Sequence, residues 1–134
     1  VLRQVELAGW ADGPVREIAQ LRMLVHASPV PEPFGQVIVE AMAVGTPVIA
    51  TDAGGVPEIL SPLGKRVEIA DGVARGEVGI LVRPGDARAL ADAILWAMTH
   101  DELVMEMARN AYLSARARFA IEQTSRIVQD VWSV

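Results

Sequence analysis

The hydrophobic pattern alternates between short apolar runs and longer segments of helical composition. Apolar runs of four or five residues, bounded by Gly, Pro or charged residues, predict strands. The expected strands are residues 4–8, 23–27, 47–51 and 79–82, and the expected helices are residues 15–21, 36–44, 87–100, 101–118 and 121–132. Strands that alternate with helices predict an α/β fold: a parallel sheet with right-handed crossovers and helices on both faces.

The loops that follow the first three expected strands are candidates for a binding site. Ligands of parallel sheets gather at the carboxyl ends of the strands. Residues 9–13, 28–35 and 52–57 lie there, and we expect them to converge on one crevice. Residues 61–79 mix charged residues with glycine, and we interpret them as a surface excursion.

Composition limits the class of protein. A chain of 134 residues with 51% hydrophobic and 4% aromatic residues suits a single domain over residues 1–134, with a sheet covered by helices. The lack of cysteine excludes disulfides, thiolate zinc sites and a cysteine nucleophile, and it agrees with a cytoplasmic location. No apolar run approaches the roughly 18–20 residues that span a bilayer, and the first residues do not match a signal peptide.

The charge distribution is more informative than the total. A net charge of −5 argues against a nucleic-acid partner. No Lys or Arg occurs between Arg22 and Lys65, whereas four acidic residues do: Glu32, Glu40, Asp52 and Glu58. A phosphate bound in this part of the chain must be held by something other than local cations.

The expected helix at residues 36–44 contains a single charged residue, Glu40. The positions three and four residues away offer Glu40 no oppositely charged partner, and a buried carboxylate is costly unless it is hydrogen-bonded. Gln36 lies one turn before Glu40 on the same helix face. The vicinal hydroxyls of a sugar would satisfy this pair, although capping of backbone amides would also explain Glu40.

The start of the same helix suits an anion. Gly35 has no Cβ, so a ligand can approach its backbone closely, and the amides of Gln36, Val37 and Ile38 are expected to point outward at the positive end of the helix dipole. This arrangement predicts an anion site without cations. Glu32, in the proline-rich loop before the helix, could reach a group attached to that anion.

These residues belong to a longer pattern. Residues 32–58 read EPFGQVIVEAMAVGTPVIATDAGGVPE, which closely resembles the core of the C-terminal domain of retaining glycosyltransferases of family 4, with the GT-B fold. Residues 5–11 and 79–91 resemble further segments of that domain, so the similarity covers nearly the whole chain from Val5. The resemblance implies a Rossmann-like sheet that ends in three helices, within a two-domain enzyme.

The resemblance also implies roles for individual residues. Glu32 would be the catalytic residue that contacts the transferred sugar, and Glu40 would hold the ribose of the nucleotide. Phe34 and the backbone from Gly35 to Ile38, with Gln36 and Val37, would face the sugar and phosphate. The turn at Gly9, Trp10 and Ala11 would hold the base. The substrate would be a UDP-, GDP- or ADP-sugar, with no metal and no other cofactor, and the anomeric configuration would be kept.

Other parts of such an enzyme are not expected in this chain. The Arg and Lys residues of the family that grip the diphosphate lie before the point that Val5 matches, and the acceptor-binding N-terminal domain and the first strands are also absent. The resemblance therefore implies a chain that is inactive alone, with peripheral membrane contact only through the absent domain. The expected process is polysaccharide or glycoconjugate synthesis.

Alternative interpretations stay open. The chain could be a non-catalytic module that binds a nucleotide sugar for regulation, or part of a phosphorylase or epimerase with the GT-B fold. His26, beside the crevice, could touch a ligand or be a hydrogen-bonded core histidine. Lys65 and Arg66 are interpreted as solvated side chains.

Overall fold

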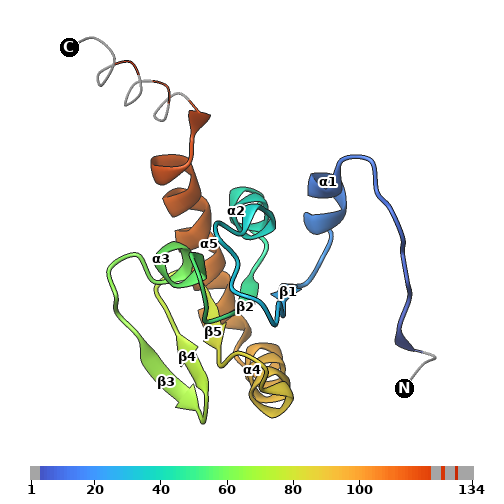
Figure 1. Ribbon diagram of the computed structural model, residues 1–134, viewed down its shortest axis with the longest axis vertical. Helices are drawn as coiled ribbons and strands as arrows, with labels where there is room; N and C mark the ends of the chain where they lie inside the picture. Colours follow the sequence, from blue (N-terminus) through green and yellow to red (C-terminus); the bar gives the residue numbers. More distant parts are fainter. Residues whose placement is uncertain (1–3, 122–124, 126–128, 130–134) are drawn as a thin grey trace.

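The computed structural model describes residues 4–121, 125 and 129. A five-stranded sheet lies between helices (Figure 1). In chain order the elements are α1 (Pro14–Ile18), β1 (Leu24–His26), α2 (Gln36–Ala43), β2 (Val48–Thr51), α3 (Val56–Leu60), β3 (Val67–Ala70), β4 (Val73–Arg75), β5 (Ile80–Val82), α4 (Ala87–Thr99) and α5 (Asp101–Arg118).

The sheet has the strand order β1-β2-β5-β4-β3. Strands β1, β2 and β5 are parallel, with Val25 opposite Ile49 and Ala50 opposite Leu81. The hairpin β3–β4 adds two antiparallel strands beyond β5. The predicted α/β fold is therefore confirmed in its parallel half. The excursion expected at residues 61–79 is instead part of the sheet.

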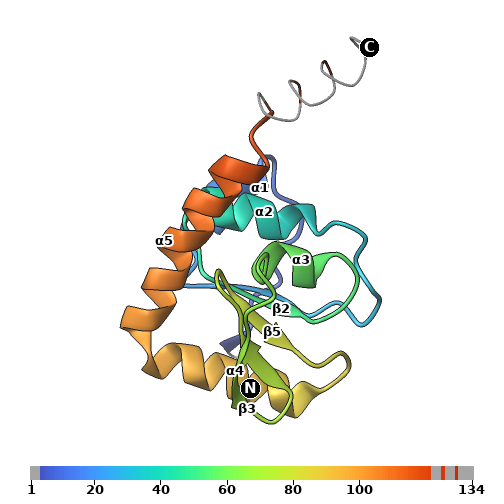
Figure 2. The same ribbon diagram turned by 90° about the vertical axis from the view of Figure 1, so that its left-hand side faces the viewer.

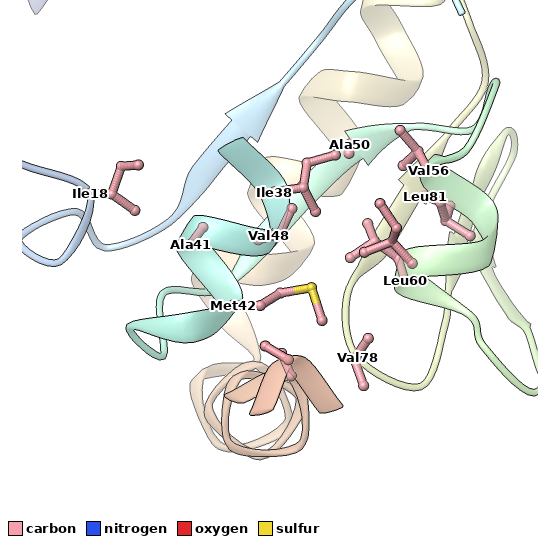
Figure 3. Packing of buried hydrophobic residues seen from close by; sticks show 13 residues of the cluster. Ile18, Ile38, Ala41, Met42, Val48, Ala50, Val56, Leu60, Val78 and Leu81 are labelled. Atoms are coloured by element: carbon pink, nitrogen blue, oxygen red, sulfur yellow. The ribbon is translucent and has the colours of Figure 1, made fainter. Parts of the chain in front are cut away.

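Strands β2 and β5 are buried along their whole length, as parallel strands covered on both faces should be. Successive side chains point to opposite faces of the sheet. Ala50 and Leu81 face the core that is built with α2 and α3 (Figure 3), whereas Ile49 and Ile80 face the core that is built with α4. The alternation divides the interior into two cores, one on each face.

Helix α5 connects the two cores (Figure 2). Val104 and Met107, near its start, belong to the α4 side, and Ala111 and Ala115, near its end, belong to the α2 side. The small alanine side chains allow α5 to lie close to α2, the two helices that make the most extensive contact between elements. The predicted helices on both faces are thus confirmed.

Several expectations need correction. Residues 4–8 form no strand, and Leu7 is 94% exposed, because no described strand lies beside them to complete a ladder. The helix expected at 15–21 is α1, shifted and shorter, and α3 was not expected. The helix expected at 121–132 lies largely outside the described residues. No helix in the described part of the chain has the length and apolarity to cross a membrane.

Candidate functional site

The loops that follow β1 and β2 contact each other through a backbone hydrogen bond and close backbone packing. The amide of Gly55 donates to the carbonyl oxygen of Glu32 at 2.8 Å. A Cβ on Gly54 would lie 2.2 Å from that same oxygen, and one on Gly55 would lie 2.4 Å from the carbonyl oxygen of Pro33. Only glycine permits so close a backbone approach, so the Gly54–Gly55 pair places Glu32 at the carboxyl end of the sheet.

Gly35 begins α2 in the left-handed conformation, with φ at 74°. Ile38 donates its amide to the Gly35 carbonyl at 3.0 Å, and its side chain is fully buried in the core beneath α2 (Figure 3). The prediction of a free amide at Ile38 is therefore wrong. The amides of Gln36 and Val37 have no hydrogen-bond acceptor among the described residues. Two outward amides remain at the positive end of the helix.

Gln36 and Glu40 form a pair along one side of α2, as their spacing predicts. The Gln36 Nε2 atom donates to Glu40 Oε1 at 2.9 Å. Gln36 is exposed and Glu40 is half-buried, so the pair lies at the surface with further acceptor capacity on the carboxylate. Such a pair can bind two neighbouring hydroxyls.

The side chains of His26, at the end of β1, and of Glu32, in the 28–35 loop, lie close to each other. His26 Nε2 lies 3.9 Å from Glu32 Oε2, and the side chains are 17% and 39% exposed, respectively. The other ring nitrogen of His26, Nδ1, is buried and has no hydrogen-bond partner. The open question about His26 therefore has a geometric answer: its Nε2 edge faces the site, and its Nδ1 edge makes no core hydrogen bond.

The ring of Phe34 packs against Phe119, the residue that directly follows α5. The two rings meet edge-on, with centroids 5.8 Å apart. Next to Phe119, Arg118 donates to the carbonyl oxygens of Glu58 and Ile59 at the end of α3. The end of α5 therefore contacts both the Phe34 loop and α3.

A further loop at the carboxyl end of the sheet follows β5, and sequence reasoning did not select it. A cavity of about 230 Å³ lies at the carboxyl ends of β1, β2 and β5. Its lining comprises Ala27, Pro29, Thr51, Val82, Arg83, Gly85, Asp86, Ala87 and Leu90. Strand 79–82 was predicted, so the loop after it could have been counted by the same rule that selected the other two.

The loop at 9–13 does not join this crevice in the structure. Trp10 is 91% exposed, and its indole nitrogen donates only to Asp12, at 3.0 Å. The prediction that the 9–13 loop joins the other two loops is therefore wrong. The expected strand at residues 4–8, which would have placed this loop at the edge of the sheet, is not formed. The assignment of Trp10 and Ala11 to a base site stays a prediction.

Two arginines that border the site are already paired with acids. Lys65 and Arg66 are exposed, as predicted, and Arg66 also contacts Asp52 at 2.7 Å. Arg83 contacts Asp71 at 2.7 Å and Asp86 at 3.1 Å. The hydrogen bond and positive charge of Arg83 lower the pKa of Asp71, and the same contacts raise the pKa of Arg83. Both arginines therefore already have carboxylate partners within the described chain.

The described residues contain no cluster of three or more His, Asp or Glu side chains that could hold a metal ion. The polar groups near the end of β1 and the start of α2 are two amides, the Gln36–Glu40 pair, the carboxylate of Glu32 and Nε2 of His26. This set suits a ligand that combines hydroxyl groups with an anion.

Comparison with known proteins assigns the family. Residues 2–114 match the family described as glycosyl transferases group 1, and the chain belongs to that family. It is 41% identical over 86 residues to phosphatidyl-myo-inositol mannosyltransferase of Mycobacterium leprae, which covers 64% of this chain and 18% of that protein. It is 33% identical over 129 residues to D-inositol 3-phosphate glycosyltransferase of a Nocardioides strain, covering 96% and 23% of the two chains.

Solved structures share the fold. Anabaena HepE in complex with UDP matches with a TM-score of 0.73 at 33% identity, over 89% of this chain and 29% of HepE. The C-terminal domain of a group 1 family protein, LpcC from Francisella tularensis, matches with a TM-score of 0.65 at 30% identity, over 86% and 53% of the chains. The fold is thus the Rossmann-like domain of GT-B glycosyltransferases. The chain spans about a fifth of the length of the first curated relatives it matches.

Proposed function

We propose that this chain forms the donor-binding part of a glycosyltransferase that takes a nucleotide sugar as its donor. The observation that carries the proposal is the Gln36–Glu40 pair together with the free amides of Gln36 and Val37 at the start of α2. A nucleoside diphosphate carries both kinds of group that these residues would bind, ribose hydroxyls and phosphate oxygens. HepE, a protein of the same fold, has been crystallised with UDP and with UDP-glucose.

In this proposal Glu40 accepts hydrogen bonds from the ribose hydroxyls, and the amides of Gln36 and Val37 face the phosphate and sugar. Glu32 contacts the transferred sugar and orients the donor without acting as a nucleophile. The acceptor then attacks on the face from which the diphosphate departs, so the anomeric configuration is retained. Charge stabilisation by amides and side chains makes the transfer independent of a metal.

The paired arginines support a division of the active site between two parts of a larger protein. Arg66 and Arg83 are neutralised by aspartates, and the helix start has no cation of its own. We therefore place the cations that neutralise the diphosphate outside these 134 residues, together with the acceptor site. The chain alone would bind weakly and be inactive.

Replacement of Glu40 in the full-length protein tests the proposal. Glu40→Ala removes a charged hydrogen-bond acceptor, a loss of about 1.5–3 kcal/mol, so UDP, GDP or ADP should bind about 10- to 100-fold more weakly. Glu58→Ala, which removes an exposed carboxylate on α3, is the matched control and should leave affinity unchanged. Isothermal titration calorimetry measures both.

Unchanged affinity in Glu40→Ala would refute the ribose contact. Nucleotide binding without sugar transfer, across a broad panel of donors and acceptors, would favour the regulatory module. Conversion of the donor that requires inorganic phosphate, or no acceptor, would indicate a phosphorylase or an epimerase.

A further inference from the structure

His26 has an unusual environment for a histidine at the end of a strand. Its main-chain carbonyl accepts a hydrogen bond from Thr51 Oγ1 at 3.3 Å, which joins β1 to β2 at the site. The side chain is largely buried, yet Nδ1 finds no hydrogen-bond partner. A purely structural histidine would normally be held by hydrogen bonds at its buried nitrogen.

The unpartnered Nδ1 favours one form of the ring. A proton on Nδ1 would bury an N–H group without an acceptor, which is costly, whereas an unprotonated Nδ1 leaves only a lone pair unused. The proton of the neutral ring is then on Nε2. That atom faces Glu32 Oε2 at 3.9 Å, so the polar edge of the ring is directed at the carboxylate.

No other contact fixes the orientation of the Glu32 carboxylate within the described chain. It is 39% exposed, and no hydrogen bond to its oxygens is present among the described residues. Its backbone is fixed by the Gly55 amide, so only the side-chain torsions remain to be set. A modest rotation closes the gap between Oε2 and Nε2 to a hydrogen bond.

We propose that His26 is a positioning residue that holds the Glu32 carboxylate in the orientation needed to contact the transferred sugar. The inference rests on the proposed function, because it gives His26 a role only through Glu32. It predicts that His26 matters for the sugar part of the donor and for turnover. Binding of the nucleoside diphosphate, which does not reach Glu32, is independent of His26.

Three substitutions in the full-length protein separate this role from a structural one. Gln can place an amide N–H near the position of Nε2, Asn can replace only Nδ1, and Leu fills the space without a donor. His26→Leu and His26→Asn should lower kcat with the nucleotide sugar about 10- to 100-fold, as misplacement of a reacting group does. His26→Gln should stay within about threefold, less than 1 kcal/mol. Affinity for the nucleoside diphosphate should be unchanged in all three.

The opposite pattern overturns the proposal. It fails if His26→Leu keeps full turnover, if Gln rescues no better than Leu, or if nucleoside diphosphate affinity falls in parallel with kcat, which indicates a structural role. Coupling gives a further check: in a Glu32→Gln background, His26→Leu should add less than about a threefold loss.

The test distinguishes this inference from the proposed function. Loss of nucleotide affinity in Glu40→Ala together with unchanged turnover in His26→Leu refutes the role of His26 alone. Unchanged affinity in Glu40→Ala refutes the proposed function. If Leu impairs folding, the comparison of Gln with Asn, both polar amides, still decides the role of His26.

Discussion

Residues 28–35 and residues 4–13 are both irregular segments rich in turn residues, but they differ in what holds them. The first segment receives a hydrogen bond from Gly55, lies against the backbone of Gly54, and packs Phe34 on Phe119. The second makes no backbone hydrogen bond to another described segment. Its Leu7 and Trp10 side chains are almost fully exposed.

The difference shows that turn residues do not by themselves fix the path of a segment. Neighbouring elements must also contact it. Segment 28–35 connects strand β1 to helix α2, and its path is set by Gly54 and Gly55, which allow its backbone to approach closely. Segment 4–13 contains no strand and is exposed along its whole length, so no described element sets its path. The tests below change the contacts of one segment or the other.

The largest effect is expected from Gly54→Ala. Gly54 has a φ of +64°, and a Cβ there would lie 2.2 Å from the Glu32 carbonyl oxygen. Left-handed strain of about 1–2 kcal/mol adds to overpacking of about 1–3 kcal/mol, so the free energy of unfolding should fall by about 2–5 kcal/mol. Donor affinity should fall as well, because the Glu32 loop must move. Chemical denaturation and calorimetry measure the two quantities.

Gly64→Ala is the matched control for Gly54→Ala. Gly64 has a similar φ of +70°, but nothing lies within 4 Å of the added Cβ. This variant should lose only the strain of about 1–2 kcal/mol and keep donor affinity. Equal losses in the two variants would mean that the close approach to Glu32 contributes nothing.

An intermediate effect is expected from Phe119→Leu. The substitution keeps an apolar side chain but removes the edge-on contact with Phe34 at 5.8 Å, which is worth about 0.5–1.5 kcal/mol. Thermal unfolding of Phe119→Leu, Phe34→Leu and the double variant gives the coupling between the rings. Additive losses would show that the contact does not stabilise the 28–35 loop.

The smallest effect on stability is expected from Trp10→Ala. Trp10 is 91% exposed, so its loss should change the free energy of unfolding by less than about 0.5 kcal/mol. Trp96→Ala is the contrasting variant, because Trp96 packs against the α4 core and stacks on His100 with centroids 4.3 Å apart. A loss above about 1 kcal/mol in Trp10→Ala would show that residues 4–13 are packed in the protein, and the contrast with residues 28–35 would no longer hold.

Much of the fold follows from local pattern. The continuous apolar runs at 47–51 and 79–82 correctly predict β2 and β5, because strands covered on both faces tolerate few polar residues. Asp86 caps α4 by accepting from the Ala89 amide at 2.9 Å, as its position before an apolar helix predicts. The α3 helix was not expected, because the Gly54–Gly55 pair before it and Pro57 within it indicate a loop.

Part of the chemistry of the candidate site could also be predicted from the sequence. The spacing of Gln36 and Glu40 places them one helical turn apart, and they meet on one side of α2. The amide of Ile38 illustrates the limit of such reasoning. It closes a tight first turn with Gly35, a detail of helix starts that sequence does not resolve.

The sequence by itself determined the class of fold and the helix that starts directly after Gly35. It also placed Glu32 in the loop before that helix and Glu40 on one side of the helix. These features depend on neighbours within a few residues. Only the tertiary structure decided that Arg66 pairs with Asp52 and that His26 faces Glu32. Such contacts join segments whose distance depends on strand order and on the path of the chain, and no local preference encodes them.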